Sequence, residues 1–108
     1  MAGQWARIVA ECEEYPILIE ALIEDGGAIK RNVVYLGFHG PLGECYPFVL
    51  LPEGRLDYGG EGDADQYADT NFLTVRPREG ATFTIEEFDE ETGRPQDAVY
   101  TITRIERL

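Results

Sequence analysis

The chain has 108 residues, of which 21 are Asp or Glu and 9 are Lys or Arg, so its formal net charge is -12. Apolar residues make up 44% of it, which is typical of a folded globular domain, so the charge alone does not imply disorder. The acidic balance excludes direct binding to a nucleic-acid backbone, because phosphates require a basic surface. We expect a single β domain spanning residues 1–108.

The first residues carry no targeting pattern. Residues 1–7 lack the basic start and long apolar run of a secretory signal, and no apolar stretch approaches the roughly 18 residues of a membrane span. We therefore expect a cytoplasmic protein that does not enter a membrane. Cys12 and Cys45 are too far apart for a redox pair, so packed thiols are expected, with a disulfide between them as the alternative in an exported protein.

Alternation of apolar and polar residues predicts strands in the first part of the chain. Residues 6–12 place Ala and Ile on one face, as a half-buried strand does. Residues 16–24 fit a strand with three Ile, or a short helix that begins near Pro16 and ends before Gly26. The β-branched residues favour the strand. The sequence Asp25-Gly26-Gly27 predicts a tight turn.

The rest of the chain repeats this pattern of apolar runs between breakers. Loops are predicted at 37–43, which is rich in Gly, at 56–70, which has three Gly and five acids, and at the acidic turn 89–95. Further strands are predicted at 29–38, 46–51, 71–76, 82–88 and 98–105. The pattern predicts an all-β, mostly antiparallel fold, a small six- to seven-stranded barrel or sandwich, with a short helix at 16–24 as the one alternative.

The C-terminal third resembles the closing hairpin of the C-terminal β-barrel of elongation factor Tu. In that family a Gly-x-x-Phe-x-Ile-x-Glu stretch begins one strand, and a short strand ending in a basic residue and Ile closes the barrel. The corresponding positions here are Gly80, Phe83, Ile85, Glu87, Arg104 and Ile105. An acidic insert at 88–97 replaces the compact glycine turn of the family. The resemblance implies a small six-stranded barrel and carries over no binding residue.

Catalytic motifs are missing from the sequence. It contains no phosphate-binding glycine loop, no nucleophile elbow and no Ser at all. Its one His, His39, lies six residues before Cys45, so a Cys–His nucleophile or a zinc site with Cys12 is the alternative from the class of enzymes and metal proteins. No oriented base, oxyanion donor or regular ligand spacing accompanies these residues, so we expect no catalytic residue, metal or cofactor.

Asp63-x-Asp65-x-Tyr67-x-Asp69 has the alternating start of a calcium loop. It lacks the glycine after the third ligand position, and Thr74 stands where a bidentate Glu is needed. A solvated loop is the preferred interpretation of this segment.

Charge is the remaining functional signal, because the acids gather in three segments. Six lie in 11–25, five in 57–69 and five in 86–91. Such acids keep a domain soluble, or they form a surface that attracts a basic protein partner. We expect a non-catalytic interaction protein, of the inhibitor, immunity or assembly-subunit type, that docks a basic protein. Aromatic residues among charges are typical of interface anchors. The expected contact residues are Tyr58, Asp63, Asp65, Tyr67 and Asp69.

Overall fold

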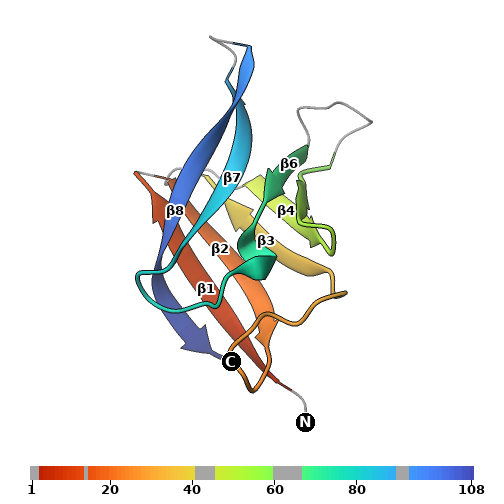
Figure 1. The fold of residues 1–108 in the computed structure, drawn as a ribbon, viewed down its shortest axis with the longest axis vertical. Helices are drawn as coiled ribbons and strands as arrows, with labels where there is room; N and C mark the ends of the chain where they lie inside the picture. The colour runs from red at the N-terminus through yellow and green to blue at the C-terminus, as the bar shows by residue number, and fades with distance from the viewer. Residues whose placement is uncertain (1–2, 14, 41–45, 60–66, 90–92) are drawn as a thin grey trace.

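The structure is a computed structural model that describes residues 3–13, 15–40, 46–59, 67–89 and 93–108. Each strand pairs antiparallel with the next one along the chain, and the last pairs back onto the first, so the sheet closes into a barrel (Figure 1). The strands are β1 (Gln4–Cys12), β2 (Tyr15–Ile23), β3 (Tyr35–His39), β4 (Tyr46–Leu51), β5 (Arg55–Asp57), β6 (Tyr67–Thr70), β7 (Thr82–Asp89) and β8 (Arg94–Arg107). The predicted all-β antiparallel fold is confirmed, but the barrel has eight strands instead of the six or seven expected.

The first two strands follow the predicted alternation. In β1, Ala6, Ile8 and Ala10 are buried, and in β2 every second residue from Ile17 to Ala21 is buried. The strand interpretation of 16–24 is therefore correct and the helix alternative is wrong. A helix would have turned some of these apolar side chains away from the interior, whereas a strand turns them all to one face.

Two short strands overlap the predicted loop 56–70: β5 covers its first two residues and β6 its last four. In β5, Leu56 is fully buried, and its register partner in β6, Ala68, packs against the core. Both strands are too short, and too rich in acids, for their alternation to stand out against the surrounding glycines. The expected loop is wrong for these residues.

The predicted strand at 71–76 is also wrong. Residues Phe72–Thr74 form a short 3-10 helix, η2, in which the consecutive residues Phe72 and Leu73 are both buried. A strand would send one of two neighbouring side chains outward, so two adjacent apolar residues can both enter the core only where the backbone turns.

The segment predicted as a strand at 29–38 is extended only from Tyr35. Asn32 has a φ of 64°, in the left-handed region that interrupts a strand, and Ile29 forms an isolated bridge with Ile23. The loop expected at 37–43 is wrong for residues 37–39, which belong to β3. Glycine is required at position 37 of this strand, because the Cβ of any other residue would meet the Leu18 carbonyl and lie 2.7 Å from Cζ of Phe48.

Side chains fill the barrel interior. Phe83 stacks on Tyr100 with ring centroids 5.6 Å apart, and Phe72 meets Phe83 edge to face at 5.0 Å. The Tyr35 hydroxyl, on the far wall, donates a hydrogen bond of 2.7 Å to the Lys30 carbonyl. Within the described part of the chain, no charged or polar residue is classed as buried. Among the described residues, the barrel interior is therefore an apolar packed core.

Candidate functional site

The two ends of the barrel hold different described segments. At one end of the barrel β1 begins, β8 ends and both chain termini lie (Figure 1); we call it the closed end. The connection from β6 to β7 includes η2, whose Phe72 and Leu73 are buried in the core. The opposite end, which we call the open end, holds the β1–β2 turn and the last residues of β3, β5 and β7. There the β7–β8 hairpin extends beyond the other strands as a two-stranded ribbon (Figure 1).

A pocket of about 770 Å³ lies at the open end, between the protruding part of β8 and the β1–β2 turn. Its described lining contains acids and tyrosines and no Lys, Arg or His. The lining residues are Glu11, Cys12, Glu13, Tyr15, Gly40, Tyr46, Gln96, Asp97, Ala98, Val99, Tyr100 and Thr101. Tyr15 and Tyr46 are 49% and 51% exposed, so aromatic surface is available beside the carboxylates. Such a lining suits a cationic group, because carboxylates and aromatic faces both attract one.

An acidic row leads across the outside of the barrel to this pocket. By strand register, Asp69 of β6 lies opposite Glu86 of β7, and Glu86 lies opposite Asp97 of β8. All three side chains are exposed. We call Asp69, Glu86 and Asp97 the acidic row. Like charges directly opposite each other on a sheet are destabilising, so this row is unfavourable for the isolated barrel.

Arg55 of β5 is the cation at the far end of the acidic row. Its Nε donates a hydrogen bond of 3.3 Å to Asp69 Oδ1, and its guanidinium lies 5.7 Å from the centroid of the Tyr67 ring. Both partners of the ion pair are about half exposed or more, and such pairs contribute at most about 1 kcal/mol. Arg55 therefore offsets one of the three charges, and only partly.

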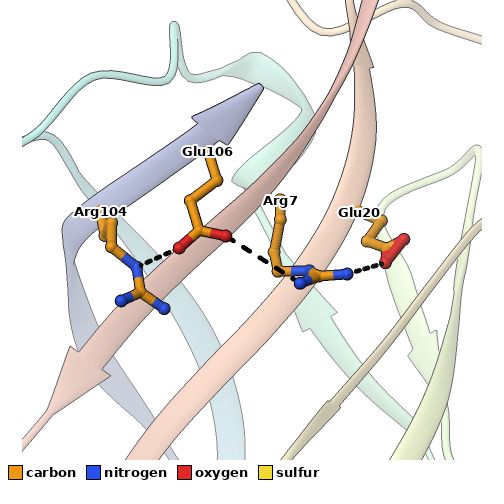
Figure 2. A network of polar contacts seen from close by, with 4 residues as sticks. All are labelled: Arg7, Glu20, Arg104 and Glu106. Atoms are coloured by element: carbon orange, nitrogen blue, oxygen red, sulfur yellow. Dashed lines mark hydrogen bonds and ion pairs between the residues drawn. The ribbon is translucent and has the colours of Figure 1, made fainter. Parts of the chain in front are cut away.

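Four other arginines lie away from the open end, whereas Arg94 begins β8 at the outer end of the β7–β8 hairpin. Figure 2 shows Arg7 of β1 between Glu20 of β2 and Glu106 of β8, at 3.1 and 4.0 Å, with Arg104 bonded to Glu106 at 3.0 Å. This network crosses the seam where β8 closes onto β1. A smaller pocket of about 440 Å³ at the closed end is lined by Arg78 and Arg107 as well as by acids. Among the described lining residues, the pocket at the open end thus carries negative charge alone, whereas the pocket at the closed end carries both signs.

The predicted contact residues differ in burial and do not all lie in one place on the barrel. Tyr58 packs against the core and meets Phe48 edge to face at 5.8 Å, so much of its ring is covered. Tyr67 is 40% exposed, and Asp69 belongs to the acidic row. Asp63 and Asp65, together with the predicted calcium-like loop start, lie outside the described residues. The structure therefore brings Tyr67 and Asp69 together around Arg55.

The alternative centre on His39 and Cys45 is only partly within the described chain. The backbone of His39 ends β3 opposite Tyr46, while its side chain and the whole of Cys45 lie outside what the structure describes. Cys12 is half-buried at the pocket rim. Among described residues, no three His, Cys, Asp or Glu side chains come together as metal ligands. No helix in the described ranges has the length and apolar character needed to cross a membrane.

Sequence reasoning missed most of the pocket lining. Glu11 and Glu13 were grouped with acids as far along the chain as Asp25, although the structure places Asp25 at the closed end. Asp97 lies within the acidic insert 88–97, and Tyr15 was given no role in the sequence analysis. These pocket-lining residues share one feature: each lies at or near the end of a strand that reaches the open end. That feature becomes usable only when the barrel order is known.

No family model, no curated protein and no solved structure matches this chain. The resemblance to the elongation factor Tu barrel stays a prediction, and the six strands that it implied differ from the eight that form.

Proposed function

We propose that this protein is a cytoplasmic, non-catalytic binding protein that docks a basic protein partner on its open end. The observation that carries the proposal is the acidic row, which runs without an interposed cation into a pocket lined by further carboxylates. An inhibitor, an immunity-type protein or an assembly subunit would each use such a surface.

The acidic row explains why a partner would be basic. Glu86 lies between two other carboxylates, which costs the free protein stability. A partner that brings Lys or Arg to this row removes the repulsion and gains attraction at once. The same field speeds association, because concentrated charge of one sign steers a complementary partner toward the site.

Aromatic side chains provide the second component of the surface. Tyr15 and Tyr46 flank the pocket, and Tyr67 lies beside the acidic row, each between 40% and 51% exposed. Tyr is enriched at interface hot spots because it adds apolar contact area and a polar tip. We therefore assign these three residues as anchors, in place of the half-buried Tyr58.

Affinity capture with a matched pair of variants tests the proposal. The open-end variant carries Glu11→Gln, Glu13→Gln and Asp97→Asn, and the closed-end variant carries Glu24→Gln, Glu53→Gln and Glu79→Gln. All six acids are exposed, and both variants lose the same charge. Each protein is immobilised, incubated with lysate of the native host, and the captured proteins are identified by mass spectrometry.

We expect the wild type and the closed-end variant to capture the same basic protein, and the open-end variant to lose it. Raising the salt from about 50 to about 500 mM shortens the Debye length severalfold and should release that protein. Equal capture by both variants, or a captured partner that salt does not release, would contradict the proposal.

A further inference from the structure

The outer half of β8 has a strand neighbour on only one side within the described chain. On one flank, β7 pairs with β8 from Thr82 opposite Thr101 as far as Asp89 opposite Arg94. On the other flank, β1 pairs with β8 no further toward the open end than Glu11 opposite Thr101. Beyond that point no other described strand pairs with the β7–β8 ribbon (Figure 1), and the flank of β8 that β1 leaves without a described partner borders the pocket.

Ile102 shows which way the backbone groups of β8 face. Its N–H donates to the Ala81 carbonyl, and its carbonyl accepts from the Gly80 N–H, both at 2.8 Å, so both groups face the β7 side. Successive residues of an antiparallel strand turn these groups to opposite sides. The register from Thr101 to Arg94 is regular, so the N–H and C=O groups of Val99 and Asp97 face away from β7.

These backbone groups form a short edge with a defined end. Val99 and Asp97 both line the pocket, with Glu11 and Glu13 among the residues of its other wall. Pro95 has no N–H, so the edge ends there, as natural sheets end an exposed edge. An unpaired strand edge beside a pocket is the geometry in which a peptide adds to a sheet.

The pocket has room for such an addition. A strand of about five residues is about 17 Å long, and with a spacing of about 4.8 Å and a thickness of about 10 Å it fills on the order of 800 Å³. The pocket measures about 770 Å³.

We propose that the edge of β8 at Asp97 and Val99 accepts an extended, basic peptide segment as an additional strand. Backbone hydrogen bonds to Asp97 and Val99 hold the segment. Its Lys or Arg side chains lie against Glu11, Glu13 and Asp97, and the exposed rings of Tyr15 and Tyr46 lie on the same pocket. The inference rests on the proposed function and specifies the form in which the basic partner is bound.

Electrostatics favour a basic peptide over a second copy of the chain as the occupant of the β8 edge. Two copies joined edge to edge at β8 would bring two acidic edges against each other, each from a molecule with a net charge of -12. Like charges paired across strands are destabilising, whereas a basic segment at the same edge is attracted.

A peptide titration followed by NMR tests the inference on the full chain. The probe is a short blocked peptide of alternating lysine and valine, and the comparison probes are its glutamate–valine counterpart and the lysine–valine sequence with every backbone nitrogen methylated. The methylated peptide keeps the charge and loses the ability to donate backbone hydrogen bonds. Amide chemical shifts and amide hydrogen exchange report which backbone groups become paired.

We expect the lysine–valine peptide to bind, with new exchange protection at the Val99 and Asp97 amides, and the glutamate–valine peptide not to bind. The methylated peptide should bind about fivefold more weakly or worse, since a lost hydrogen bond of about 1 kcal/mol corresponds to that factor. Val99→Pro removes an edge-facing N–H and should weaken binding similarly, whereas Val99→Ala keeps the N–H and should bind as the wild type does. Protection of the other amides of β8 shows that each variant is folded.

The outcomes separate this inference from the function on which it rests. If the methylated peptide and Val99→Pro both bind as tightly as their controls, strand addition is wrong while acidic docking stands. If the lysine–valine peptide does not bind, or the glutamate–valine peptide binds as well, both the inference and the proposed electrostatic docking are overturned. Dimerisation through β8 without peptide, seen by analytical ultracentrifugation, would contradict the choice of occupant.

Discussion

Replacing Phe72 with Ala tests whether η2 seals the core. The Phe72 side chain is fully buried, and its ring meets that of Phe83 at 5.0 Å and 75°. Truncation removes this contact and leaves a cavity beneath the helix, and Phe→Ala changes in cores cost about 3–5 kcal/mol. Because 1 kcal/mol shifts the Tm of a domain of this size by about 4 °C, we expect the Tm to fall by about 12–20 °C.

Thr74 provides the matched control for this change. It is an exposed residue of the same helix, and its Oγ1 donates a hydrogen bond of 2.8 Å to the Asn71 carbonyl. Thr74→Ala should lower the free energy of unfolding by no more than about 1 kcal/mol. Urea unfolding of both variants measures the difference. A loss of less than about 1 kcal/mol for Phe72→Ala would show that η2 does not seal the core.

Three further changes test other parts of the structure. Gly37→Ala places a Cβ 2.7 Å from Cζ of Phe48 and should cost about 1–3 kcal/mol in urea unfolding, whereas Gly26→Ala, with no atom within 4 Å, should cost much less. Burial raises the pKa of the Tyr35 hydroxyl above its usual 10.0. The neutral hydroxyl therefore contributes its full stabilisation below pH 10.0, and this stabilisation is lost as the pH rises through the folded pKa. Thermal melts across alkaline pH should show a smaller loss of stability in Tyr35→Phe. Glu86→Lys turns two repulsive pairs of the acidic row into attractive ones and should stabilise the free protein by about 1 kcal/mol, a gain that chemical denaturation would fail to find if the row is not repulsive.

The sequence predicted the strands whose alternation is long enough to be read. β1 and β2 each have nine residues with every second side chain turned inward, so period two is unmistakable there. β5 and β6 have three and four residues, too few to establish a period, and their acids and flanking glycines are typical of loops. The extra strands of the barrel therefore came from the segment with the weakest pattern.

The 3-10 helix η2 shows a second limit on what could be predicted from the sequence. Phe72, Leu73 and Thr74 have the composition of a strand. The backbone turns there because the two consecutive apolar side chains of Phe72 and Leu73 are both buried in the core, which a strand does not allow. Gly37 shows the opposite case, because a residue that normally breaks a strand is required within one by the close approach of Phe48.

The acidic character of the proposed binding surface was predictable from the sequence, but the residues that compose it were not. Asp69, Glu86 and Asp97 are separated by up to 28 positions in the chain, and only the register of three strands makes them neighbours. Glu11 and Glu24 belong to one acidic segment of the sequence, yet they line pockets at opposite ends of the barrel. Strand direction, which composition does not reveal, decides which acids act together.

We propose that the open end, and not the net charge of -12, recruits a basic partner. Isothermal titration calorimetry of the lysine–valine peptide tests it most directly, at about 50 mM salt, with the wild type, the open-end variant and the closed-end variant. We predict that the open-end variant binds about tenfold more weakly than the wild type, which corresponds to about 1.4 kcal/mol, and that the closed-end variant binds within about twofold of it. Equal weakening in the two variants would show that only total charge matters and would contradict the account.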